Sequence, residues 1–406
     1  MFSNKTKINT RFLTEEGNAV LASNYLFVAK VKIGSNKQEF NLILDSGSIV
    51  TWVAAQGSND IIPIAHHFNP SASSTCSKTI LSSFHIKYEN EEEVSGNYYI
   101  DNFYYINDKA FKLVFGLATQ TYFSTNVADG IIGLGHSYES NAMLFIHMIN
   151  FAGISNSESF SLKFGNNIEA GASGKLIIGK HDDFSKNNLA SCPVKKGDYL
   201  WICQLNGFGL KTSANEIKTK KSYNVIFDTG ANFIFLPMDY FNEIDGQLQK
   251  INCISITNEA QDKFQIICRA IVELPNFTFE INGNTLVVPN YYAFTRKGQY
   301  YFSNIIFTKS EKYIIGIPFF LSYHTLFDKE NEKLVFYPEQ NINKQLNLEN
   351  SEKIIDKNNL FSYTHIIIII SSILFCIGLI SLIYYSIRKM KTIKRMDNIE
   401  NKLLSK

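Results

Sequence analysis

The sequence predicts a mainly β protein built of two related lobes that meet at a cleft, followed by a C-terminal transmembrane helix. Three observations support this prediction. Phe and Tyr are plentiful, with 32 and 21 residues, and many short alternating or β-branched runs suit strands. An Asp-Ser/Thr-Gly triplet follows an apolar run once in each half of the chain body. A run of 22 uncharged residues follows near the C-terminus.

The composition allows a large folded body and does not suggest a nucleic-acid partner. The 406 residues are 45% hydrophobic and 14% aromatic, which is enough for a sizeable core. The net charge is only +2, and because the tail 388–406 carries +5, the remaining residues carry −3. We expect a monomer whose partners are peptides or proteins and a lipid bilayer.

The first acidic turn lies in NLILDSGSIVTWVA, residues 41–54. An apolar run leads into Asp45, and Ser46, Gly47 and Ser48 follow. A carboxylate at the edge of a core costs free energy unless it is paired, hydrogen-bonded or used in chemistry. One such triplet on its own is typical of a strand that ends in an Asx turn.

The second acidic turn changes that interpretation. In YNVIFDTGANFIFLP, residues 223–237, an apolar run leads into Asp228, Thr229 and Gly230. The two aspartates are 183 residues apart, which is close to half of the chain before its C-terminal segment. Two matches, each at the end of an apolar strand, are far stronger than one.

Each triplet belongs to a coarse internal repeat. The first half continues to ADGIIGLG at 128–135 and a helix-like pattern at 139–153. The second half continues through a helix-like pattern at 237–251 to YIIGIPFF at 313–320. This repetition predicts two lobes related by a pseudo-twofold axis.

Two acidic turns placed face to face would bring Asp45 and Asp228 together. Two carboxyl groups in one site cannot both ionise cheaply, so one keeps a proton while the other is charged. The ionised group can take a proton from a water that attacks a carbonyl, while the protonated group polarises that carbonyl. The titration belongs to the pair, and the sequence does not assign the charge to either residue.

The neighbouring residues are expected to support this pair. Glycine after each aspartate allows close approach of the backbone. A hydroxyl on each turn can lock it to the other turn, and a further hydroxyl can hold the first carboxylate in place. The residues concerned are Ser46, Gly47, Ser48, Thr229 and Gly230.

These motifs resemble those of the pepsin-like aspartic endopeptidases, peptidase family A1. Asp45-Ser-Gly-Ser and Asp228-Thr-Gly-Ala match the two catalytic motifs, and Trp52 matches the family's Trp seven residues after the first Asp. Tyr88 aligns with the family's flap Tyr. The resemblance covers roughly residues 22–338 and continues through HHFNPSASST at 66–75, FSLKFG at 160–165, GKLIIGKHDD at 174–183, LPNFTFEING at 274–283 and residues 314–338.

The resemblance implies a bilobal pepsin-like acid-protease fold with a peptide cleft closed by a hairpin flap. Asp45 and Asp228 would be catalytic, and Trp52 and Tyr88 would belong to the flap and substrate-binding region. The family needs no metal and no other cofactor, so none is expected here.

The flap departs from the family pattern. The glycines that usually follow the flap Tyr are replaced by Glu89, Asn90 and Glu91, and Glu92 and Glu93 continue the acidic run. Such a run is typical of a solvated loop. The alternative is a preference for basic residues in the substrate.

A second departure is Ala231, which stands where the family usually has a hydroxyl residue beside the second catalytic Asp. Loss of a donor to Asp228 should raise its pKa. We therefore expect a pH optimum nearer neutral than that of pepsin.

The six cysteines show no spacing typical of a metal site. Cys253 and Cys268 are close enough to form a disulfide that staples a surface excursion, and Cys192 and Cys203 flank a turn signal and could bridge two antiparallel strands. The alternative for each pair is free buried thiols.

The chain is expected to divide into five parts. They are an N-terminal extension at 1–21, a peptidase body at 22–338, a polar stalk at 339–365, a transmembrane helix at 366–387 and a basic tail at 388–406. Within the body, the N-lobe would cover about 22–185 and the C-lobe about 186–338. The apolar run is long enough to cross a bilayer, and Cys376 within it would be unpaired.

The basic tail predicts the topology of the anchor. Positive charge marks the cytoplasmic side, so the catalytic body of this single-pass protein should be lumenal or extracellular. However, the first twenty residues lack the apolar stretch of a signal peptide and leave little room for an activation segment. Either sequence is missing upstream, which we favour, or the body is cytosolic and tethered to the membrane.

The sequence therefore predicts a membrane-anchored aspartic endopeptidase that uses a two-aspartate, water-activating mechanism. The alternative function is a catalytically impaired pepsin-fold protein that holds peptides in its cleft. Both acidic motifs are retained, which favours the enzyme, and the altered flap is the feature that favours the binding protein.

Overall fold

The computed structural model describes residues 15–21, 26–88, 92–122, 128–136, 141–163, 173–179, 188–258, 263–269 and 273–338. All of these belong to the first of two units, Met1–Glu339. The predicted stalk, transmembrane helix and basic tail lie outside the described residues. Within the described ranges, no helix is both long and apolar enough to cross a membrane.

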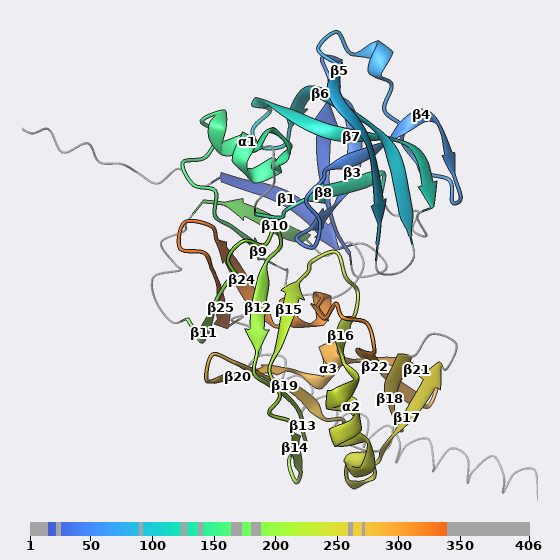
Figure 1. Cartoon of the computed structure of the whole chain (residues 1–406), viewed down its shortest axis with the longest axis vertical. Coiled ribbons are helices and arrows are strands. Elements are labelled where there is room, and N and C mark those ends of the chain that lie inside the picture. The colour runs from blue at the N-terminus through green and yellow to red at the C-terminus, as the bar shows by residue number, and fades with distance from the viewer. Residues whose placement is uncertain are drawn as a thin grey trace, which may run out of the picture. The chain divides into compact units, whose positions relative to one another are not determined.

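Thirteen of the described strands form one extended sheet, in the order β11, β25, β24, β9, β10, β1, β2, β3, β8, β4, β7, β6 and β5, with β2 also paired to β6 (Figure 1). Their bounds are β1 Glu15–Leu21, β2 Phe27–Ile33, β3 Gln38–Asp45, β4 Trp52–Asp60, β5 Ser77–Lys87, β6 Glu93–Tyr104, β7 Ala110–Tyr122, β8 Gly130–Gly133, β9 Phe160–Lys163, β10 Ser173–Ile178, β11 Ala190–Pro193, β24 Tyr323–Asp328 and β25 Lys333–Pro338.

Two further sheets are built from the second half of the described chain. The larger runs β12, β15, β23, β16, β22, β18 and β17, with β21 also paired to β22, and the smaller runs β14, β13, β19 and β20. Their bounds are β12 Ile202–Leu205, β13 Gly207–Lys211, β14 Glu216–Lys218, β15 Tyr223–Phe227, β16 Ile234–Pro237, β17 Cys253–Asn258, β18 Lys263–Arg269, β19 Asn276–Ile281, β20 Asn284–Val288, β21 Phe294–Lys297, β22 Tyr300–Thr308 and β23 Ile314–Ile315.

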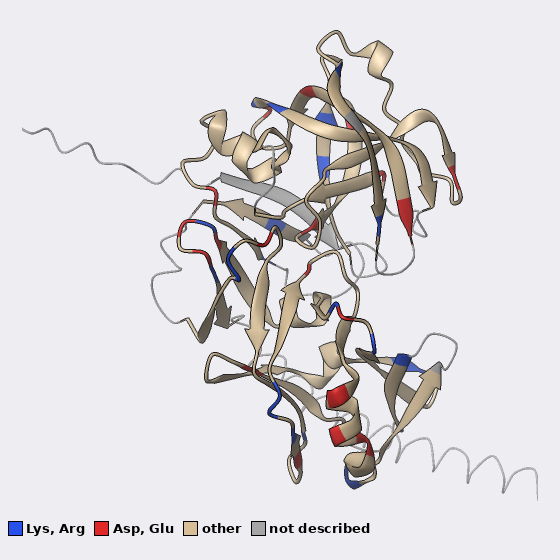
Figure 2. Cartoon of the chain, viewed as in Figure 1, with Lys and Arg blue, Asp and Glu red and all other residues tan. Residues whose placement is uncertain are grey.

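The helices of the described chain are short. They are α1 Phe145–Phe151, α2 Met238–Ile244, α3 Asn290–Ala293 and α4 Ile317–Phe320, with 3₁₀ turns at Pro70–Ala72, Asn141–Met143 and Asp245–Ile251. Both predicted helices are therefore shorter than expected. The first is confined to α1 after a 3₁₀ turn, and the second continues as a 3₁₀ turn after α2. Acidic residues lie on α2 (Figure 2), and two of them, Asp239 and Glu243, form ion pairs with Lys221.

The two halves of the chain share the large sheet. The C-terminal strand β24 pairs with β9 of the first half, so that Thr325 lies opposite Leu162 and Phe327 opposite Phe160. The rings of Phe160 and Phe327 stack with centroids 4.5 Å apart. This shared region joins the halves through backbone pairing as well as through a common apolar core.

Candidate active site

Asp45 is the last residue of β3, where a buried strand ends in a turn. The strand pairs in parallel with β8, so that Asp45 lies opposite Gly133. The backbone carbonyl of Asp45 accepts a hydrogen bond of 2.8 Å from Leu134 N, and the residue as a whole is 5% exposed. Pairing to β8 therefore fixes the main chain at the point where the carboxyl group emerges.

Asp228 occupies the equivalent place in the second half. It follows β15, which pairs in parallel with β23, so that Phe227 lies opposite Ile315. Asp228 N donates a hydrogen bond of 3.0 Å to the carbonyl of Ile315. The ADGIIGLG and YIIGIPFF segments thus provide β8 and β23, the parallel neighbours of the two strands that lead to the acidic turns.

Ser46 and Thr229 lock the two turns together, as the sequence predicted. Ser46 N donates to Thr229 Oγ1 and Thr229 N donates to Ser46 Oγ, each over 3.0 Å. The hydroxyls then donate to backbone carbonyls of the opposite half, Ser46 Oγ to Phe227 and Thr229 Oγ1 to Leu44, each over 2.7 Å. Ser46 and Thr229 are fully buried, so these four bonds are shielded from water. We call this group the hydroxyl lock.

Gly47 and Gly230 let each turn pack against the opposite carboxyl group. A Cβ atom on Gly47 would lie 2.3 Å from Cγ of Asp228, and one on Gly230 would lie 2.6 Å from Cγ of Asp45. Any side chain at these positions would therefore displace the carboxyl groups. Each glycine also donates its N–H to the aspartate two residues before it, over 2.8 Å for Asp45 and 2.7 Å for Asp228.

The two carboxyl groups lie close together, because each packs against the glycine that follows the other, and their titrations are coupled. Burial raises the pKa of Asp45, while hydrogen bonds from Asp228, Ser48 and the backbone oppose that rise. Burial, followed by the charge of Asp45, raises the pKa of Asp228 well above its usual value. The pair therefore holds one proton over a range of pH in which isolated carboxyl groups are ionised.

Tyr88 covers this site from the hairpin formed by β5 and β6. Trp52 Nε1 donates a hydrogen bond of 2.8 Å to the Tyr88 hydroxyl. Burial and then the charge of Asp45 raise the pKa of Tyr88, and its hydroxyl is also within hydrogen-bond reach of Ser48. The structure thus brings together both residues predicted for the flap region and the first acidic turn.

Comparison with known proteins agrees with this geometry. The family model for eukaryotic aspartyl proteases matches residues 26–338. The chain belongs to the eukaryotic aspartyl protease family. It is therefore an aspartic-type endopeptidase, with the mainly β, bilobal, pepsin-like fold that the sequence predicted.

The protease is similar to named relatives over most of its length. It is 26% identical over 302 residues to vacuolar protease A of Arthroderma otae, and the alignment covers 72% of this chain and 71% of the relative. It is 25% identical over 325 residues to gastricsin of Cavia porcellus, covering 76% and 79%. It is 27% identical over 341 residues to chymosin of Callithrix jacchus, covering 80% and 83%.

The two described glutamates of the acidic flap, Glu92 and Glu93, differ in their surroundings. Glu93 is directed to Lys87 and His85, with N···O distances of 3.8 and 3.5 Å. Glu92 is 9% exposed, and its carbonyl accepts a hydrogen bond of 2.8 Å from Tyr88 N. Because the burial of Glu92 does not fit a fully solvated loop, both interpretations of the flap stay open. Residues 89–91 lie outside the described ranges.

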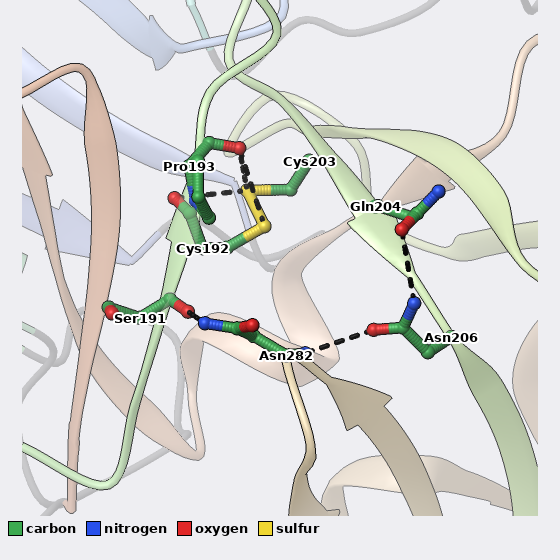
Figure 3. The surroundings of a disulfide bond; sticks show 7 residues. All are labelled: Ser191, Cys192, Pro193, Cys203, Gln204, Asn206 and Asn282. Atoms are coloured by element: carbon green, nitrogen blue, oxygen red, sulfur yellow. Dashed lines mark hydrogen bonds between the residues drawn. A yellow bond between two sulfur atoms is a disulfide. The ribbon is translucent and has the colours of Figure 1, made fainter.

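Both disulfides considered from the sequence are present. Cys253 and Cys268 lie opposite each other on β17 and β18 and are bonded. Cys192 and Cys203 are also bonded, although their strands belong to different sheets and do not pair with each other as expected. Figure 3 shows this disulfide beside Asn282, whose side chain donates to the carbonyl of Ser191 over 3.1 Å. The Cys192–Cys203 disulfide therefore joins the large sheet to the sheet that contains β15, the strand before Asp228.

Cys76 is the free cysteine within the described ranges. Burial, followed by the charge of Asp101, raises the pKa of its thiol to about 12. The thiol is therefore protonated at neutral pH, which disfavours nucleophilic chemistry. Among the described residues, no group of three or more His, Cys, Asp or Glu side chains could hold a metal ion.

The sequence patterns missed Trp201, which is 1% exposed and whose carbonyl accepts a hydrogen bond of 2.9 Å from Phe227 N, one residue before Asp228. Its position just before β12 gives no motif of its own. The available signal was its place between Cys192 and Cys203, because a disulfide between these residues restrains the segment that lies between them.

Proposed function

We propose that the protein is a membrane-anchored aspartic endopeptidase that hydrolyses peptide bonds with a water molecule activated by Asp45 and Asp228. The observation that carries this proposal is the close approach of two carboxyl groups, each packed against the glycine of the opposite turn, in surroundings that raise the pKa of both. A pair that shares one proton offers a base and an acid to the same substrate carbonyl.

The hydrogen bonds around the pair support separate roles for its members. Asp45 accepts from Gly47 N and from the Ser48 hydroxyl, whereas Asp228 accepts from Gly230 N and its neighbour Ala231 has no hydroxyl. Donors stabilise the ionised form of a carboxyl group. Asp45 is therefore the ionised base, and Asp228 carries the proton.

The reaction then needs no group beyond the two carboxyls and water. Asp45 removes a proton from the water molecule while the oxygen of that water bonds to the carbonyl carbon of the substrate. Asp228 donates a hydrogen bond and then its proton to the carbonyl oxygen, giving a neutral tetrahedral diol. Asp45 returns its proton to the amide nitrogen as the C–N bond breaks, and the diol hydroxyl returns a proton to Asp228.

The body is proposed to face the lumen or the cell exterior. Two disulfides among the described residues support an oxidising compartment and oppose a cytosolic tether. The uncharged run at 366–387 and the basic tail support an anchor with a cytoplasmic C-terminus. This topology is tested by proteinase treatment of sealed vesicles whose cytoplasmic face is outward. The proteinase should remove a tag on the C-terminal tail and leave the enclosed catalytic body intact. Loss of the catalytic body instead would contradict it.

The catalytic proposal is tested by incubating the full chain in mild detergent with a mixed peptide library from about pH 3 to about pH 7. A statine-type mimic, which presents a tetrahedral hydroxyl to the carboxyl pair, should abolish cleavage. Cleavage that resists the mimic would contradict the mechanism. A folded chain that binds the mimic but cleaves nothing would favour the peptide-binding alternative.

A further inference from the structure

A second set of contacts joins the two halves directly behind the hydroxyl lock. It is formed by Leu134–His136 of the first half and 199–201 of the second. His136 N donates to the carbonyl of Tyr199, and His136 Nε2 lies 3.1 Å from the carbonyl of Leu200. Trp201 Nε1 donates to the carbonyl of Leu134 over 2.8 Å. We call this set the indole clamp.

The first end of the indole clamp binds the main chain of the first acidic turn. Leu134 N donates to the carbonyl of Asp45 over 2.8 Å, and Gly135 N donates to that of Ser48 over 2.9 Å. A Cβ atom on Gly135 would lie 3.1 Å from both Ser48 O and Tyr199 O. The clamp residues are therefore closely packed against this turn.

The other end binds the strand that leads to the second acidic turn. Phe227 N, one residue before Asp228, donates to the carbonyl of Trp201 over 2.9 Å. The next residue, Ile202, lies opposite Ile226 in the pairing of β12 with β15. Trp201 therefore contacts the main chain that positions each aspartate, through its carbonyl on one side and its indole N–H on the other.

The surroundings of Trp201 hold its indole in one orientation. The ring packs against Phe160 and Phe327 of the shared sheet, with centroids 5.8 and 5.2 Å away, and against His136 at 4.8 Å. A buried indole needs an acceptor in any fold. Here the acceptor is the carbonyl of Leu134, and the N–H of the same residue donates to the carbonyl of Asp45. The indole hydrogen bond is therefore connected to the main chain of Asp45 as well as filling the need of a buried N–H.

We propose that Trp201 is a positioning residue that sets the approach of Asp45 to Asp228 through the indole clamp. This inference rests on the proposed function of the pair. The path from one aspartate to the other passes through Leu134, Trp201 and Phe227 by three hydrogen bonds of 2.8–2.9 Å. The hydroxyl lock fixes the turns at their tips, and the indole clamp fixes the strands behind them.

The inference is tested with Trp201→Phe in the full chain, which removes the N–H but keeps an aromatic ring in the cluster. Tyr240→Phe is the matched control, because it also removes one donor from a buried aromatic residue to a backbone carbonyl, that of Lys221. Both variants should lose thermal stability. Trp201→Phe alone should lower kcat by about ten- to a hundred-fold, as expected for small misplacement of reacting groups.

Two further readouts separate positioning from stability. The KM of Trp201→Phe should stay within about two-fold of wild type, and the alkaline limb of its pH–rate profile should move to lower pH because weaker coupling lowers the pKa of Asp228. A Trp201→Phe protein whose kcat and pH profile match those of Tyr240→Phe would overturn the inference. If Trp201→Phe does not fold, Gly135→Ala perturbs the same clamp, and a folded Gly135→Ala protein with wild-type kcat would overturn it equally.

Binding of the statine-type mimic distinguishes this inference from the proposed function, since binding needs no turnover. An inactive wild type would defeat the proposed function. The inference would still require Trp201→Phe to bind the mimic about ten-fold more weakly than Tyr240→Phe does. Equal affinities would overturn the inference whether or not the wild type cleaves peptides.

Discussion

Ala231→Ser should lower the pKa of Asp228 and shift the activity of the protease towards acid. Ser48 donates its hydroxyl to Asp45 from three residues further along the chain. Ala231 holds the same place after Asp228 and has no hydroxyl to donate. A new donor stabilises the ionised form of Asp228, so its proton is lost at lower pH.

The size of the effect follows from one hydrogen bond. A hydrogen bond to a charged group contributes about 1.5–3 kcal/mol. Because one pKa unit corresponds to about 1.4 kcal/mol, the alkaline limb of kcat/KM should move down by about 1–2 pH units. The acid limb reports ionisation of Asp45 and should move less.

The assay is the pH dependence of kcat/KM for one peptide, measured on full-chain wild type and Ala231→Ser. Ser48→Ala is the reciprocal control, because loss of its hydroxyl should raise the pKa of Asp45 and move the acid limb to higher pH. If Ala231→Ser matches wild type while Ser48→Ala moves the acid limb, the reasoning about Ala231 is refuted. If neither limb moves, the assignment of base and acid is refuted.

Three further predictions concern the lock, the flap and the free thiol. Thr229→Val leaves two buried backbone groups unpaired, so denaturant titration should show a free energy of unfolding lower by about 2–6 kcal/mol; an equal loss in Thr229→Ser would contradict this. Replacing Glu91, Glu92 and Glu93 by Gln should weaken selection for peptides with Lys or Arg. Identical cleavage profiles would instead favour the interpretation of this segment as a solvated loop. Cys76 should resist alkylation at neutral pH, since burial and a nearby carboxylate raise the pKa of its thiol to about 12. Rapid modification in peptide mapping would contradict that.

Much of the site could be predicted because its chemistry is local in sequence. Asp45 and Asp228 each stand at the end of an apolar strand. Glycine stands two residues later because a Cβ atom at that position would collide with the carboxyl group of the opposite turn. The repeat also predicted that the two turns would meet. Ser46 and Thr229 form the expected lock because each turn presents one hydroxyl to the other half.

Other features depend on long-range pairing that no local pattern encodes. The return of β24 to pair with β9 depends on the whole sheet, and no local pattern predicts the register of that pairing. The pattern at 237–251 lengthened the expected helix because apolar spacing does not distinguish an α-helix from a following 3₁₀ turn. Trp201 was missed because its acceptor, Leu134, is 67 residues away.

The most direct test of the account is turnover by Asp45→Asn and Asp228→Asn, measured on full chains shown to be folded. Each substitution keeps the shape of the side chain but removes either the base or the acid. The account predicts that both variants lose at least about a hundred-fold in kcat, as expected for loss of general acid–base catalysis. A folded variant of either kind that retains near wild-type turnover would contradict the two-aspartate mechanism.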